Sequence, residues 1–223
     1  MIKVSQVPYI KTLNDFGVDN LRSSCNKLKI KCIINQELPP LLNERKGISY
    51  KSVDYRLRRM RSSASFSTCK DYRWYLSRYI NENPKTLIFV GLNPSLANQN
   101  ENDPTLKRLI GFAELWGYGS LVVVNLFARI TKSPKFLASC KDPVGFKNDF
   151  ELNKRISYWE TNDSCDLWIG WGISGRLRNR DTLLLKRIKE SSKKPYVIGL
   201  TKDGYPQHPL YTSKQKTLFQ MKL

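Results

Sequence analysis

Three residues with chemically useful side chains follow apolar segments or stand near the end of the chain. Asn93 lies in the stretch Gly91-Leu92-Asn93-Pro94-Ser95, Asn125 ends the apolar run 121–124, and His208 is the only histidine. An amide donates and accepts hydrogen bonds, so it can orient a water molecule or recognise the edge of a nucleobase. An imidazole can stabilise a leaving group on which negative charge develops. Because there is one histidine, any Ser-His-Asp arrangement would have to use His208 itself.

Four short apolar segments predict the strands that position these residues. They are 86–90, 121–124, 167–169 and 196–198, and Leu106, Leu109, Ile110 and Phe112 give the segment 104–116 a helical spacing. Strands that are apolar throughout are typical of a sheet covered on both faces. We therefore expect an α/β fold, a three-layer α/β/α sandwich with a mainly parallel central sheet.

A loop rich in glycine or polar residues follows each predicted strand. The first two loops carry Asn93 and Asn125, the third is Gly170-Trp171-Gly172, and the fourth runs from Gly199 to His208. The carboxyl ends of parallel strands share one edge of a sheet, where ligands bind in open α/β folds. The sequence therefore predicts that four loops meet at one crevice.

The ordered motifs GLNPS, VVVN, LWIGWG and HPLY resemble the signature loops of the uracil-DNA glycosylase superfamily over about residues 72–215. With RWYL at 73–76, DPT at 103–105 and WGY at 116–118, the chain looks like an uncharacterised family of that fold. The resemblance implies a monofunctional DNA glycosylase, which flips a base out of the helix and hydrolyses its N-glycosidic bond. It also implies a monomer that needs no metal or organic cofactor.

The resemblance assigns roles to individual residues. Asn93 would position the attacking water, His208 would stabilise the departing base, and Asn125 would recognise that base. The other residues expected at the base are Gly91, Leu92, Pro94 and Ser95, and those expected at DNA are Gly172, Arg176, Leu210, Tyr211, Arg58 and Arg59. Two positions depart from the superfamily: Asn93 stands where its most active members have Asp, and no Ser follows Pro209.

Composition agrees with a polyanionic partner. The 223 residues include 38 Lys+Arg and 19 Asp+Glu, for a formal charge of +19, which suits the phosphates of double- or single-stranded DNA. Residues 1–68 are interpreted as a basic N-terminal extension that ends in the Ser-rich stretch 62–67, a linker or exposed loop, and residues 69–223 as the α/β domain. Asp103 is expected to cap the following helix, and Thr105 and Arg108 are weaker candidates for the crevice.

Several other classes do not fit the sequence. It contains no GxxxxGK[ST] or GxGxxG motif, and its five cysteines form no CxxC pair, so nucleotide-triphosphate, dinucleotide and zinc chemistry are not predicted. No apolar run is long enough for a membrane span and Met1–Ser5 lacks a signal-peptide pattern, so we expect a cytoplasmic protein. Three alternatives stay open: excision of a hypermodified base of phage type, a non-catalytic nucleic-acid-binding module, and a hydrolase of free nucleosides.

Overall fold

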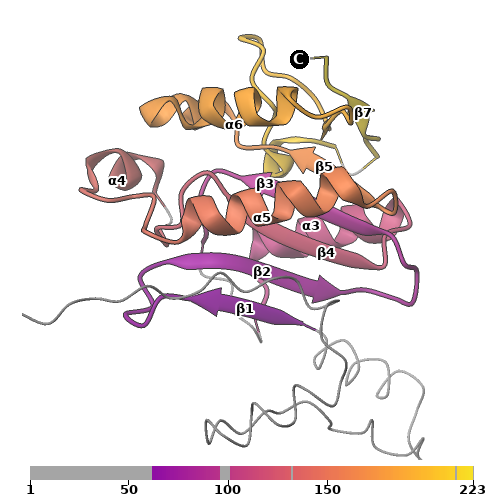
Figure 1. The fold of residues 1–223 in the computed structure, drawn as a ribbon, viewed down its shortest axis with the longest axis horizontal. Coiled ribbons are helices and arrows are strands. Elements are labelled where there is room, and N and C mark those ends of the chain that lie inside the picture. Colours follow the sequence, from indigo (N-terminus) through magenta and orange to yellow (C-terminus); the bar gives the residue numbers. More distant parts are fainter. Residues whose placement is uncertain (1–61, 96–100, 132, 214, 223) are drawn as a thin grey trace, which may run out of the picture. The chain divides into compact units, whose positions relative to one another are not determined.

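The computed structural model describes residues 62–95, 101–131, 133–213 and 215–222, which form a seven-stranded sheet with helices (Figure 1). All of them belong to one compact unit of the chain. The strands are β1 (Ser63–Phe66), β2 (Arg73–Tyr79), β3 (Thr86–Gly91), β4 (Ser120–Asn125), β5 (Cys165–Ile169), β6 (Tyr196–Val197) and β7 (Phe219–Gln220). The helices are α3 (Pro104–Leu115), α4 (Pro134–Ser139), α5 (Asn148–Thr161) and α6 (Arg180–Lys189), with 3-10 turns η1 (Ile173–Asn179) and η2 (Pro209–Tyr211).

The sheet is mixed, with a parallel centre. Its order is β1-β2-β4-β3-β5-β6-β7; the pairs among β4, β3, β5 and β6 are parallel, and β1, β2 and β7 add antiparallel pairs at the two edges. The four predicted strands are these four parallel strands, so their prediction is confirmed. The description "mainly parallel" holds for the centre of the sheet, because both edges are antiparallel.

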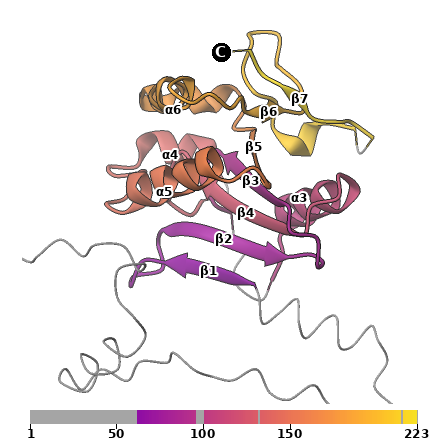
Figure 2. The ribbon, with the colours of Figure 1, turned by 45° about the vertical axis from the view of Figure 1, so that its right-hand side comes forward.

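Alternating side chains along the central strands separate two hydrophobic cores. Leu87 and Phe89 of β3 pack with α3, whereas Ile88 and Val90 pack with residues of α5 and α6. Figure 2 shows α3 and α5 on opposite sides of β3 and β4. Helices therefore cover both faces of the sheet, as the apolar strands predicted.

Helix α3 begins where the sequence indicated. Asp103 accepts a hydrogen bond from the backbone N–H of Leu106 at 2.8 Å, and Pro104 occupies the first helical turn. A carboxylate at the N-cap satisfies a backbone donor that has no partner within the helix, and proline there loses no hydrogen bond. The prediction that Asp103 caps the helix is confirmed.

The interpretation of residues 62–67 as a linker is wrong. Ser63–Phe66 forms the edge strand β1, and Ser63 lies opposite Ser77 with their hydroxyl oxygens 2.9 Å apart. Small hydroxyl side chains hydrogen-bond across a strand pair, so a serine-rich run serves as an edge strand when a partner strand lies beside it. The sheet thus begins before residue 69, and Arg58 and Arg59 lie outside the described residues. Among the described residues, no helix has the length and apolar composition that a membrane crossing requires.

Candidate functional site

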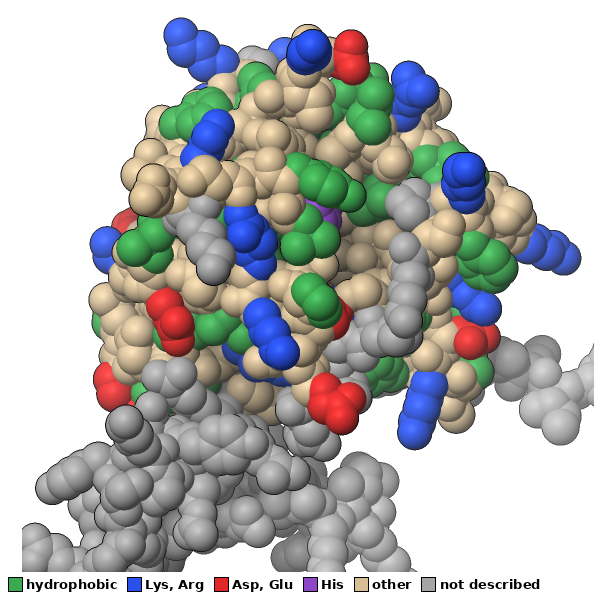
Figure 3. Space-filling view, turned by 180° about the vertical axis from the view of Figure 1, so that it is seen from behind, with side chains coloured by type: hydrophobic (Ala, Val, Ile, Leu, Met, Phe, Trp, Pro, Cys, Tyr) green, Lys and Arg blue, Asp and Glu red, His purple; other side chains and the backbone are tan. Residues whose placement is uncertain are grey.

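A cavity of about 550 Å³ lies at the carboxyl ends of the parallel strands. The connection from β3 leads through α3 to β4 on one side, and the next strand, β5, pairs with β3 on its other side. Ligands of open α/β sheets bind at such a reversal of strand order. Figure 3 shows a hollow on this face of the molecule, with the purple side chain of the single histidine visible inside it.

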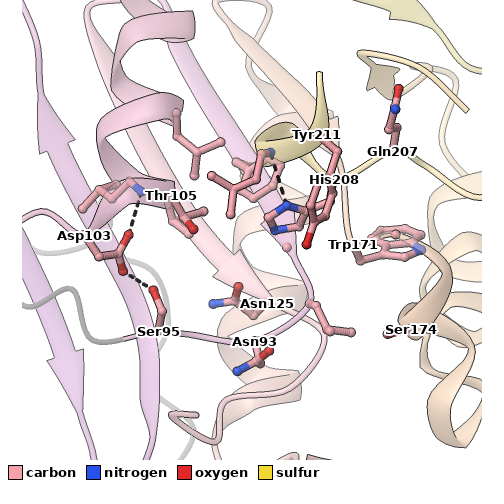
Figure 4. A pocket seen from close by; sticks show the side chains of 18 of the residues that line it. Asn93, Ser95, Asp103, Thr105, Asn125, Trp171, Ser174, Gln207, His208 and Tyr211 are labelled. Carbon is pink, nitrogen blue, oxygen red and sulfur yellow. Dashed lines mark hydrogen bonds between the residues drawn. The ribbon is translucent and has the colours of Figure 1, made fainter. Parts of the chain in front are cut away.

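The predicted meeting of the four loops is confirmed. Asn93, Asn125, Gly172 and His208, one from each loop, line this one cavity. Figure 4 shows the side chains of Asn93 and Asn125 between Ser95 and Asp103 on one side and His208 on the other. Gly91, Leu92, Ser95, Leu210 and Tyr211 also line it. Their chemical roles stay predictions.

Asn125 presents a buried donor to the cavity. Its side chain is 3% exposed, and its amide nitrogen Nδ2 has no hydrogen-bond partner among the described residues. Gly91 lies opposite Asn125 in the pairing of β3 with β4, and a Cβ on Gly91 would lie 2.9 Å from Asn125 Oδ1. The absence of a side chain at Gly91 therefore makes room for this amide. Because a buried polar group without a partner is unfavourable, Asn125 is suited to a hydrogen-bonding ligand.

The orientation of Asn93 is fixed by the main chain. Its Nδ2 donates to the carbonyl oxygens of Thr131 at 2.7 Å and Pro94 at 3.0 Å. Both amide protons are thereby used, which leaves Oδ1 as the group that can accept a hydrogen bond. Pro94 is buried and does not line the cavity. Its carbonyl group holds Asn93, and its predicted contact with a base stays a prediction.

His208 is neutral at physiological pH. Its Nδ1 accepts a hydrogen bond from the backbone N–H of Leu210 at 3.3 Å, so the ring proton belongs on Nε2. Burial lowers the pKa of His208 to about 4, because the charged imidazolium is disfavoured away from water. The residue is thus a neutral N–H donor on the cavity wall.

Arg108 fixes the loop that carries His208. Its Nε donates to the carbonyl oxygen of Pro209 at 2.7 Å, and its Nη2 donates to that of Thr212. These bonds tie the 3-10 turn after His208 to α3 across about a hundred residues of sequence. Arg108 does not line the cavity, so it is a positioning residue and not the crevice residue that the sequence suggested.

Arg73 enters the cavity because of a bulge in β2. Ser65 pairs with Tyr75 and Phe66 with Arg73, so Trp74 is an extra residue between them. Such a bulge changes the side on which the next side chain emerges. Arg73 is 4% exposed and lines the cavity together with Leu106 and Leu109 of α3. Burial lowers its pKa to about 10, and the nearby carboxylate of Asp103 acts in the opposite direction.

The two tryptophans near the third loop have different places. Trp168 packs in an aromatic cluster with Phe89, Phe112 and Trp116. Trp171 is 1% exposed and still lines the cavity.

Gly172 has φ +70°, a conformation that favours glycine, and its N–H donates to the carbonyl oxygen of Pro206. Arg176 is exposed on η1 and does not line the cavity.

At the mouth of the cavity, Leu210 is 40% exposed and Tyr211 is 80% exposed. Both belong to η2, directly after His208. Large apolar side chains of this kind are free to contact a bound molecule. In the part of the chain that the structure describes, no group of three or more His, Cys, Asp or Glu side chains could hold a metal ion.

Residues 73–210 match the model of a family described as "Protein of unknown function (DUF1643)". The match covers more than half of the chain. The chain belongs to the DUF1643 family. No curated protein and no solved structure matches it. The DUF1643 match begins at Arg73 and ends at Leu210, which both line the cavity, so it spans all four loops.

Within this DUF1643 region, the sequence did not identify several wall residues, namely Arg73, Ser174, Thr201 and Gln207. The sequence did contain a signal for Gln207, because this residue stands directly before His208. In the structure, its side chain packs closely on Gly199, where a Cβ would lie 2.4 Å from Gln207 Oε1. Arg73 stood in a motif used for the resemblance, but its place in the cavity depends on a bulge that the sequence pattern does not encode.

Proposed function

We propose that this protein is a monofunctional DNA glycosylase, which hydrolyses the N-glycosidic bond of a flipped base. The observation that carries the proposal is the single cavity shared by Asn93, Asn125 and His208. Two amides and a neutral imidazole are groups that recognise a nucleobase and stabilise it as it departs. The basic composition, with a formal charge of +19, supports a polyanionic substrate.

In the proposed reaction, Asn125 recognises the base and His208 stabilises it as it leaves. The bond between C1′ of the sugar and the base nitrogen breaks, and its electron pair leaves with the base. His208 Nε2–H donates a hydrogen bond to the base oxygen on which negative charge grows. Because Nδ1 is already an acceptor for the Leu210 N–H, Nε2 is the nitrogen that can donate.

Asn93 directs the water that completes the reaction. Its Oδ1 accepts a hydrogen bond from the water, whose oxygen then forms the new bond to C1′. The proton released from the water passes to the departing base or to solvent, since an amide does not take it up. An amide oxygen is a weaker acceptor than a carboxylate, so Asn93 suits an oxocarbenium-like sugar, which needs an oriented water more than a strong base.

The mouth of the cavity supports the flipping of a base from DNA. Lys and Arg side chains are distributed over the face around the hollow in Figure 3. Leu210 and Tyr211 project from the turn after His208 with exposures of 40% and 80%. An apolar wedge offsets part of the unstacking when a nucleotide leaves the helix. A hydrolase of free nucleosides would need neither feature.

The test is release of bases from duplexes that carry uracil, deaminated purines, alkylated bases or modified cytosines, identified by mass spectrometry. We expect release of at least one base and the formation of abasic sites. His208→Ala should lower the rate about 100-fold or more, the usual effect of removing a donor to a developing anion. Asn125→Asp should change which base is preferred.

The matched control for Asn125→Asp is Asn83→Asp. The Oδ1 of Asn83 accepts the backbone N–H of Lys85 at 2.9 Å, a bond that a carboxylate preserves, and Asn83 precedes β3 at the opposite end of the sheet. This variant should keep the base preference. Salt-sensitive DNA binding with no abasic product, unaffected by His208→Ala, would replace the enzyme with a non-catalytic binding module.

A further inference from the structure

One end of the cavity carries charged and hydroxyl groups that the proposed reaction does not use. They are Arg73, Asp103, Ser95 and Thr105, which we call the Arg73 end. Figure 4 shows Ser95, Asp103 and Thr105 on the side of the two asparagines away from Trp171. Ser95 Oγ donates to Asp103 Oδ2, while Asp103 Oδ1 caps α3. The hydroxyl and the carboxylate are thus held in place by the start of the helix.

The Arg73 end is balanced in charge and mixed in hydrogen bonding. Arg73 is 4% exposed and shares this end with the carboxylate of Asp103, which acts on it electrostatically. A guanidinium group only donates, a carboxylate only accepts, and the hydroxyls of Ser95 and Thr105 do both. An anionic substituent would meet Asp103 and a cationic one would meet Arg73. A neutral group with hydroxyls suits all of these side chains.

The size of the cavity leaves room for such a group. Its volume is about 550 Å³. A pyrimidine with its deoxyribose has about 16 non-hydrogen atoms, which need at most roughly 480 Å³ even at the roughly 30 Å³ that one water molecule occupies in the liquid. Space therefore remains beyond a nucleoside bound at Asn93, Asn125 and His208.

We infer that the Arg73 end is a subsite for a neutral, hydroxyl-bearing substituent on the base, such as a hydroxymethyl or glycosyl group. The inference rests on the proposed function and specifies its substrate class. The ring would contact Asn125 and His208, and the substituent would extend towards Arg73 and Thr105. Specificity follows because a site built to hydrogen-bond a substrate hydroxyl discriminates strongly against the analogue that lacks it.

The test compares duplexes that contain cytosine, 5-methylcytosine, 5-hydroxymethylcytosine or glucosylated 5-hydroxymethylcytosine, with uracil as a further substrate. We expect kcat/KM for a hydroxyl-bearing base to exceed that for 5-methylcytosine at least tenfold. Thr105→Val removes the hydroxyl and keeps the shape, and Arg73→Lys keeps the buried charge beside Asp103 but loses the planar fork. Each substitution should reduce this ratio of kcat/KM values to threefold or less. The control Ser139→Ala, which removes the hydroxyl of an exposed residue of α4, should keep the ratio.

The two proposals fail in different ways. Release of uracil or cytosine with no preference for hydroxyl-bearing bases, or a ratio that both variants leave unchanged, would overturn the subsite and keep the glycosylase. Release from none of these duplexes, and from none that carry deaminated purines or alkylated bases, would overturn the glycosylase, and fluorescence anisotropy with the duplexes of this test would then decide the subsite. Tenfold tighter binding of the hydroxyl-bearing duplexes that depends on Thr105 and Arg73 would support it, and equal binding would refute it.

Discussion

The half-buried imidazole of His208 makes the free energy of unfolding depend on pH, and this effect can be measured separately. Its pKa is about 4 in the folded protein, compared with about 6.5 in an unfolded chain. Well above pH 6.5 the imidazole is neutral in both the folded protein and the unfolded chain, so the contribution of His208 to stability is fully present. As the pH falls below 6.5, the unfolded chain binds a proton that the folded protein does not, so stability is lost until the pH approaches 4.

The size of this loss follows from the two pKa values. Between pH 7 and pH 4.5 a fully shielded group would lose about 2.5 kcal/mol. His208 is only half-buried, and screening by water reduces the expected loss to about 1 to 2 kcal/mol. Acid therefore destabilises the folded protein through His208, in addition to the effect of protonating its carboxylates.

The measurement is the free energy of urea unfolding at pH 7 and pH 4.5 for the wild type and for His208→Asn. Asparagine does not titrate, and its side-chain oxygen can accept the Leu210 N–H that Nδ1 accepts at 3.3 Å. Because the chain has one histidine, no other imidazole contributes. The wild type should lose about 1 to 2 kcal/mol more than the variant. Equal losses, or an imidazole that titrates above pH 6 in the folded protein by NMR, would refute the buried neutral ring.

Three further substitutions test the cavity walls. Gly91→Ala should lower the free energy of unfolding by about 1–3 kcal/mol in chemical denaturation, because the new Cβ would lie 2.9 Å from Asn125 Oδ1. The control is Gly111→Ala, where a Cβ would meet nothing within 4 Å. This helical substitution should raise the free energy of unfolding by about 0.5–1 kcal/mol. Asn125→Leu should raise the free energy of unfolding by about 1 kcal/mol while base release is lost, because it removes the buried Nδ2 that has no partner among the described residues. Arg108→Ala should lower kcat about tenfold and make the His208 ring more mobile by NMR. Arg187→Ala, which removes an ion pair with Glu160, should change neither.

Each of these expectations has a contrary result. Equal destabilisation by the two alanine substitutions would mean that the Gly91 site is not crowded. A loss of stability in Asn125→Leu would mean that Nδ2 is satisfied by groups outside the described residues. Unchanged order at His208 in Arg108→Ala would remove the positioning role of Arg108.

The central strands and the loops after them were predictable because they depend on local patterns. Runs such as 87–90 are apolar at every position, and each is followed by a glycine or an asparagine. The edge strand Ser63–Phe66 was not predictable, because its polar residues become a strand only beside β2. A serine-rich run is interpreted as a loop when the neighbouring strand, here β2, is not taken into account.

Arg73 and Arg108 show why the walls of the cavity were harder to predict than its centre. The direction of Arg73 depends on one extra residue in β2, and a change of one residue moves a side chain to the other face of a sheet. Arg108 acts on carbonyl oxygens of Pro209 and Thr212, far along the chain. Both contacts involve tertiary geometry, whereas Asn93 and Asn125 are placed by the ends of β3 and β4.

The main chain, more than other side chains, fixes the groups proposed to react. Carbonyl oxygens of Pro94 and Thr131 fix Asn93, the N–H of Leu210 fixes the tautomer of His208, and the bare backbone of Gly91 makes room for Asn125. None of these three side chains carries a charge at neutral pH, so the proposed chemistry uses hydrogen bonds and orientation without a charged acid or base. Such a site gives limited help to a poor leaving group. Its selectivity would then depend on which base fits, and the charged pair of Arg73 and Asp103 lies where it can influence that choice without taking part in bond breaking.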